Sequence, residues 1–100
     1  MEWYQQGDVL IKPVDEVPAE AAPLARPVIG EGELTGHEHL ALGEAAVVLE
    51  DGDARFLVAP HGAEAVHEEH APVTVPAGTY RIEWVREYDH FAEEARRVCE

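Results

Sequence analysis

The sequence is poor in cysteine, basic residues and aromatic residues, and each shortage argues against a class of protein. Its 100 residues include one cysteine, seven lysines and arginines together, and seven aromatic residues. A single cysteine, Cys99, cannot form an internal disulfide or build a cysteine-based zinc site. With so few aromatic rings, the core must consist mainly of valine, leucine, isoleucine and alanine.

Long apolar stretches are also absent. No run approaches the roughly 20 residues that a helix needs to cross a bilayer. Residues 1–8 show neither the basic region nor the apolar region of a signal peptide. We therefore expect no membrane association and a cytoplasmic location.

Acidic residues dominate the charge. There are 21 aspartates and glutamates, and the net charge is −14 with neutral histidine. Such a surface repels phosphate backbones, so general nucleic-acid binding is disfavoured. The charge is compatible with simple solubility, but it also favours a metal cation or a basic protein partner. A small-molecule substrate is a further candidate.

Short segments rich in β-branched residues, separated by glycine and proline, predict a mainly β fold. The expected strands are residues 8–14, 28–34, 37–42, 46–50, 55–59, 71–75 and 79–88. Residues 63–66 fit either a strand or a helical turn. Residues 91–98 are expected to form a short C-terminal helix. The chain has no room for the crossover helices of a parallel sheet.

Turn signals connect these segments. Asp51 and Gly52 between two apolar runs predict a hairpin, and Pro72 predicts either an edge strand or a place at the first residue of its strand. Three prolines make residues 15–27 a surface loop without regular structure. We expect one domain, residues 1–100, folded as a small antiparallel barrel or sandwich. Its exposed strand edges favour a homo-oligomer.

Two histidine pairs carry the candidate chemistry. His37 and His39 are two residues apart, so on a strand both imidazoles point to one face. His67 and His70 are three apart, so they share a face on one helical turn but not on a regular strand. The second pair therefore forms a site only if the chain turns there, and the nearby Pro72 favours a turn.

Together the pairs offer four imidazoles, enough for zinc or another divalent first-row metal. In this hypothesis His37, His39, His67 and His70 are the ligands, and Glu68 or Glu69 is the general base of a metal-dependent hydrolase. The contrary interpretation is that all of these are solvent-facing polar residues.

Two further functions use the same composition. In a metal-free enzyme, two histidines act as acid and base on a phosphodiester of the RNA type, while Arg81 stabilises the developing negative charge. In a non-enzymatic module, the acidic face binds a basic partner. For Arg81, a surface ion pair is the simpler interpretation.

The chain resembles a group of short, uncharacterised bacterial and phage proteins. The resemblance lies in residues 6–10, 32–39, 67–72, 76–81 and 86–88, and it implies no activity. A local resemblance to cupins lies in His37, Glu38 and His39, in Glu44, and in residues 75–78. It implies a metal held in a β-barrel by two histidines, a glutamate and a later histidine. In this sequence Arg81 stands near the place of that later histidine.

Overall fold

The computed structural model describes residues 2–31 and 37–84. It contains ten strands and, in these two ranges, no helix. The strands are β1 Tyr4–Gln6, β2 Val9–Pro13, β3 Ala22–Pro23, β4 Val28–Glu31, β5 Glu38–Leu42, β6 Val47–Asp51, β7 Ala54–Ala59, β8 Ala63–His67, β9 His70–Val75 and β10 Gly78–Trp84. The mainly β prediction is confirmed. The expected helix at 91–98 lies outside the described residues.

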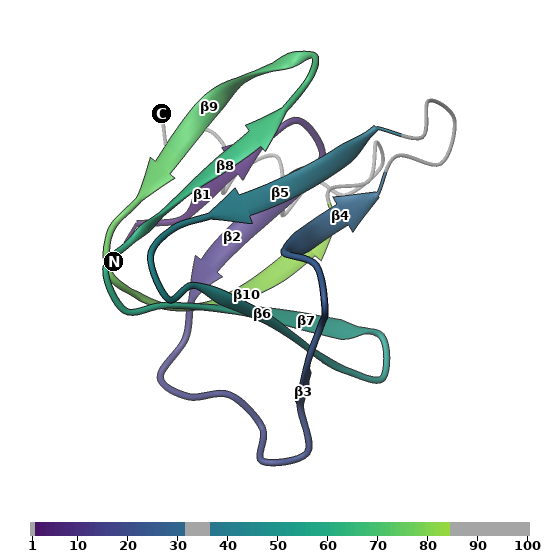
Figure 1. The fold of residues 1–100 in the computed structure, drawn as a ribbon, viewed down its shortest axis with the longest axis vertical. Helices are drawn as coiled ribbons and strands as arrows, with labels where there is room; N and C mark the ends of the chain where they lie inside the picture. Colours follow the sequence, from purple (N-terminus) through teal and green to yellow (C-terminus); the bar gives the residue numbers. More distant parts are fainter. Residues whose placement is uncertain (1, 32–36, 85–100) are drawn as a thin grey trace.

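The strands form two antiparallel sheets that pack as a sandwich (Figure 1). One sheet has the order β1-β2-β10-β7-β6-β3 and the other has the order β4-β5-β8-β9. Both sheets contribute buried side chains to one core, with Ile11 and Leu57 from the first and Ile29 and Val75 from the second. The described strands do not close into one ring, so the barrel alternative is wrong.

Strand β10 shows how the sequence pattern sets the faces of the six-stranded sheet. Tyr80 and Ile82 alternate with polar residues, and both are buried against the core. Trp84 shares their face, as expected, but 45% of it is exposed because it lies at the end of the strand. The prediction of a half-buried strand is confirmed from Gly78 to Trp84, and residues beyond 84 are not described.

The predicted hairpin between β6 and β7 exists, with its turn one residue later than expected. Asp51 pairs with Ala54, so Gly52 and Asp53 are the two turn residues. Gly52 adopts a φ of 60°, which suits a turn with glycine at its first central position. Asp51 is therefore the last strand residue, and Asp53 completes the turn without adding a bulge.

The second sheet ends in the hairpin of β8 and β9 (Figure 1). Residues 63–66 belong to a strand, which resolves the earlier ambiguity. Strand β9 is an edge strand, the first of the two alternatives that Pro72 predicted, because its missing N–H is not needed there. The loop prediction for residues 15–27 is wrong at Ala22–Pro23, which pairs with the edge of β6.

Two buried or half-buried polar side chains connect the sheets. Arg55 on β7 donates a hydrogen bond to the carbonyl oxygen of Val28 on β4 (3.1 Å). Gln6 on β1 donates to the carbonyl oxygens of Ala65 on β8 and Ala71 on β9 (2.9 Å each). These contacts hold two sides of the sandwich together where no backbone ladder does. In the described ranges, no helix is long and apolar enough to cross a membrane.

Candidate metal centre

Four imidazole rings meet beside the β8–β9 hairpin. The ring centroid of His67 lies 4.2 Å from that of His39, 4.7 Å from that of His70 and 5.7 Å from that of His37. The centroids of His39 and His70 are 5.8 Å apart. The two histidine pairs, about thirty residues apart in the chain, therefore form one cluster.

The hairpin explains how His67 and His70 meet. The two residues are paired directly across β8 and β9, and Glu68 and Glu69 form the turn between them. Side chains directly opposite each other in an antiparallel pair lie on the same face. The chain does turn here, as the site required, but it makes a strand reversal instead of a helical turn.

The β5–β8 register brings in the other pair. Leu40 pairs with Val66, so one step further along the antiparallel ladder places His39 opposite His67. His39 points inward and only 4% of it is exposed. His37 precedes β5 by one residue and contacts the same His67 ring from the solvent side.

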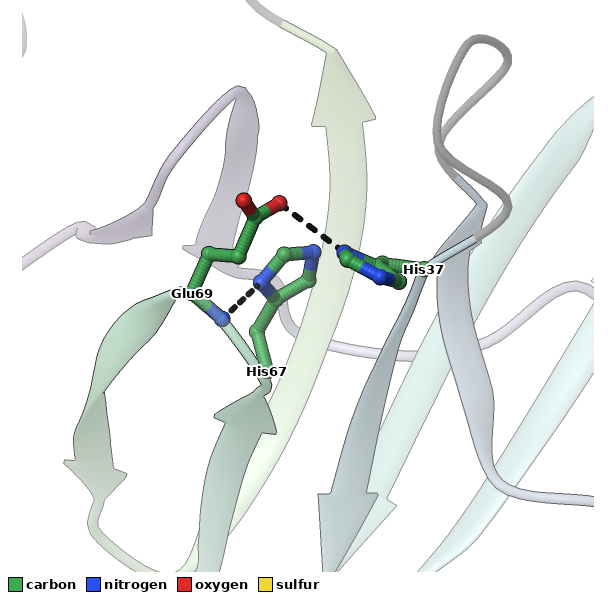
Figure 2. A group of neighbouring side chains, drawn as sticks. All are labelled: His37, His67 and Glu69. Atoms are coloured by element: carbon green, nitrogen blue, oxygen red, sulfur yellow. Dashed lines mark hydrogen bonds and ion pairs between the residues drawn. The ribbon is translucent and has the colours of Figure 1, made fainter.

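Two glutamates of the hairpin turn contact His37. Its Nδ1 lies 2.9 Å from Oε1 of Glu69 (Figure 2), and its Nε2 lies 3.2 Å from Oε2 of Glu68. Because carboxylates only accept hydrogen bonds, both contacts are satisfied only when both ring nitrogens carry hydrogen. The hydrogen bond from His37, followed by the attraction of its charge, lowers the pKa of Glu69.

One ligand atom each from His37, His67 and Glu69 lies within 4.8 Å of the other two. This group could hold a metal ion. The backbone N–H of Glu69 donates to Nδ1 of His67 (3.0 Å). A neutral His67 therefore carries its hydrogen on Nε2.

His39 has the opposite tautomer, which Gln6 determines. Both N–H groups of the Gln6 amide are engaged by the two backbone carbonyls, so its oxygen is free to accept. That oxygen lies 3.0 Å from Nδ1 of His39, which must therefore be the donor. Burial lowers the pKa of His39 to about 4, with further lowering by His67 and His70 against a smaller opposing effect of Asp8.

A family model described as a domain of unknown function, DUF8820, matches residues 5–84. The chain belongs to the DUF8820 family. The match contains every residue of the histidine cluster. Searches of curated proteins and of solved structures found no match. The expected membership of an uncharacterised group is thus confirmed at the level of a domain of unknown function.

Glycines give the rings of the DUF8820 domain space to pack. Gly7, in the β1–β2 turn with a φ of 57°, lies against His70, and a Cβ there would be 2.6 Å from its Nε2. Gly30 lies against the Trp84 indole, and a Cβ there would be 2.9 Å from Cζ2. Trp84 in turn contacts His39, with centroids 6.2 Å apart.

A pocket of about 370 Å³ opens beside the cluster, within the volume range of small-molecule sites. It is lined by His37, Glu38, Leu40, Val66, His67 and Glu68. Leu40 and Val66 are a cross-strand pair and supply the apolar part. Arg26 binds both carboxylate oxygens of Glu38, at 2.6 and 3.0 Å, and lowers the pKa of that carboxyl.

The DUF8820 fold does not bring Arg81 to the histidines. Arg81 lies on the face of β10 opposite Tyr80 and Ile82, where it contacts Glu83 (3.4 Å) and the Phe56 ring. The cupin-like ligand set is not assembled either. Glu44 is exposed in the β5–β6 connection, at the end of β5 away from His37.

Gln6 is the site residue that the sequence did not reveal. Strand β1 was not predicted, because three residues are too few for a clear period-2 pattern. The only available signal was a polar side chain directly before the Gly7–Asp8 turn. Nothing in that signal indicates burial next to a histidine from another sheet.

Proposed function

We propose that this DUF8820 domain is a metal-binding protein whose histidine cluster holds a divalent first-row transition metal, most suitably zinc. One observation carries the proposal: rings from two distant segments lie 4.2–5.8 Å apart around His67 and His39. Imidazoles are ligands that first-row metals prefer, so rings from two segments gathered in one cluster suit a shared cation.

The separations support this function quantitatively. With a zinc–nitrogen bond of about 2.1 Å, two imidazoles on one tetrahedral ion place their ring centroids about 5 Å apart. The observed separations lie on both sides of that value, so the rings are close enough to share an ion once their nitrogens turn toward it. The His37–His67–Glu69 group is also a ligand type that zinc uses, with a fourth position left for water.

Binding must displace protons in this arrangement. A cation bound to one nitrogen of His37 replaces the hydrogen between that nitrogen and Glu68 or Glu69, and the other nitrogen keeps its hydrogen. Binding through Nε2 of His67 moves its hydrogen to Nδ1 and breaks the bond from the Glu69 N–H. We therefore expect metal uptake to weaken as pH falls and to alter the backbone of the hairpin turn.

The test uses the full chain without a histidine tag and without exposure to chelators. We expect about one equivalent of metal by elemental analysis, and a higher melting temperature when zinc is added to the metal-free protein. Less than about a tenth of an equivalent, together with no stabilisation by zinc, contradicts the proposal. His61→Ala is the matched control, because His61 is exposed in the β7–β8 turn.

Hydrolysis is the catalytic function that the pocket favours. It opens beside His37 and His67 and contains Glu68, whose side chain is 77% exposed and can reach a water molecule. A bound metal supplies a water of lowered pKa. The metal-free reaction on a phosphodiester is less favoured, because Glu68 and Glu69 place negative charge at the rim of the cluster.

A neutral ester is therefore the first substrate to test. We expect zinc-dependent ester hydrolysis that falls in Glu68→Gln, while Glu64→Gln on the adjoining strand β8 leaves the rate unchanged. Equal rates in both variants would remove Glu68 from the reaction without affecting the metal proposal.

A further inference from the structure

The metal group formed by His37, His67 and Glu69 does not include His39, although His39 is the most buried histidine described. Burying an imidazole costs free energy unless its nitrogen atoms regain the hydrogen bonds that they lose to water. One nitrogen, Nδ1, is accounted for by Gln6. In the part of the chain that the structure describes, Nε2 has no hydrogen-bond partner.

The Gln6 amide can be placed in only one orientation, with its nitrogen as donor to the backbone and its oxygen as acceptor from His39. Its amide nitrogen faces two carbonyl oxygens, so exchanging the nitrogen and oxygen would place three acceptors together. The amide is 2% exposed and fixed from β8 and β9. The hydrogen on Nδ1 of His39 is thus set by backbone atoms of its own sheet, acting through Gln6 of the six-stranded sheet.

We infer that Gln6 is a positioning residue of the metal centre, which fixes His39 as the Nδ1–H tautomer and thereby makes its Nε2 a metal-ligand atom. The inference rests on the proposed metal-binding function and deepens it. Metal-binding histidines usually donate their other ring N–H to an acceptor that fixes tautomer and ring orientation. Gln6 occupies that position for His39.

The geometry also defines the partners of His39. The three centroid distances among His39, His67 and His70 are 4.2, 4.7 and 5.8 Å. All three lie below about 6.4 Å, the centroid distance of two imidazoles on opposite sides of zinc. The ligand atoms of these three rings do not yet converge as those of His37, His67 and Glu69 do, so an inner set of three histidines requires the His67 and His70 rings to turn toward Nε2 of His39.

The first measurement reads the tautomer in the metal-free protein by nitrogen-15 NMR of the histidine rings at neutral pH. Wild type should show Nδ1–H at His39. Gln6→Met, which removes the acceptor, should lose this signature. Gln5→Met is the control, because the Gln5 amide binds the backbone oxygen of Gly7 instead. An Nε2–H signature in wild type overturns the inference.

The second measurement adds zinc. The inference expects the Nε2 resonance of His39 to shift on binding, and zinc affinity to fall about 10- to 100-fold in Gln6→Met but not in the Gln5→Met control. His39→Phe keeps the ring volume and should lose affinity similarly, with melting temperature confirming that each variant is folded.

The outcomes separate the two proposals. If zinc binds at one equivalent and shifts His37 and His67 but not His39, the role of Gln6 is wrong and the metal site stands. If no zinc binds to wild type, the metal site is wrong, and the ligand role of His39 falls with it even where the tautomer is as expected.

Discussion

Two polar residues bridge the sheets of this sandwich, and they differ in what they leave unsatisfied. Arg55 contacts Glu50 through Nε and Nη2, Glu31 through Nη2 and Val28 through Nη1. Gln6 likewise uses its whole amide, but the oxygen of that amide contacts Nδ1 of His39. The second imidazole nitrogen of His39, Nε2, has no hydrogen-bond partner among the described residues. The Arg55 contacts are thus satisfied within the fold, whereas the hydrogen bonds through Gln6 lead to an imidazole nitrogen with an available lone pair.

The difference separates a structural polar group from a binding site. Arg55 is opposed by carboxylates and a carbonyl, so its charge and donors are neutralised within the fold. The histidine cluster instead places four rings of one chemical type together, and such rings cannot satisfy one another fully. We therefore expect changes at Arg55 to affect stability, and changes at the cluster to affect metal affinity.

The largest expected effect is at His67, which belongs to both candidate ligand sets. His67→Ala should lower zinc affinity by at least about 100-fold, because an imidazole ligand and the contact between the two sets are lost together. Isothermal titration with zinc measures this loss of affinity, and His61→Ala, at an exposed histidine, is the control. Unchanged affinity would show that the cluster is only a packing arrangement.

Replacing Arg55 should have the opposite result, a loss of stability with little change in zinc affinity. Arg55→Met leaves the Val28 carbonyl without its donor and leaves Glu31 facing Glu50, so we expect the free energy of unfolding to fall by about 1–3 kcal/mol. Zinc affinity should stay within about twofold of wild type, because the hydrogen-bond partners of Arg55 are Glu50, Val28 and Glu31 and include no histidine of the cluster. Urea unfolding with and without zinc tests both parts, and a large loss of affinity would break the comparison.

Acid should weaken the metal-free protein through His39. Its pKa is about 4 in the folded chain and 6.5 when exposed, so between these values the unfolded chain binds the proton and the folded chain does not. The free energy of unfolding therefore decreases as pH falls from 6.5 to 4. The lowered pKa of Glu69 adds a loss of the same sign at more acidic pH.

The measurement is urea unfolding in chelator across this pH range. His39→Phe should show a shallower dependence than wild type between pH 6.5 and 4. Matching slopes would mean that His39 is not held neutral by the fold.

The smallest effect is expected at the exposed ion pair of Arg26 and Glu38. Arg26→Gln should leave the melting temperature unchanged, because solvent screens such pairs. Thermal unfolding at low and high salt checks this. A clear, salt-dependent loss of stability would make this pair a third connection of the same kind as the Arg55 bridge.

Local patterns predicted the strands that alternate or carry β-branched runs. Strand β10 was visible because Tyr80 and Ile82 alternate with polar residues, and Pro72 indicated an edge strand or the first residue of a strand. The β6–β7 turn was found but misplaced by one residue, because Asp51 and Gly52 fit the same turn chemistry as Gly52 and Asp53. Strand β1 was too short to be detected.

The sequence by itself determined an acidic, mainly β domain with two histidine pairs and no cysteine chemistry, because composition and residue spacing act locally. Only the tertiary structure decided that His67 and His70 lie opposite each other across a hairpin, that His39 faces His67, and that Gln6 reaches His39 from another sheet. The physical reason is that strand register and sheet packing join residues about 30 to 60 positions apart, and hydrogen bonds between sheets leave no periodic trace in the chain.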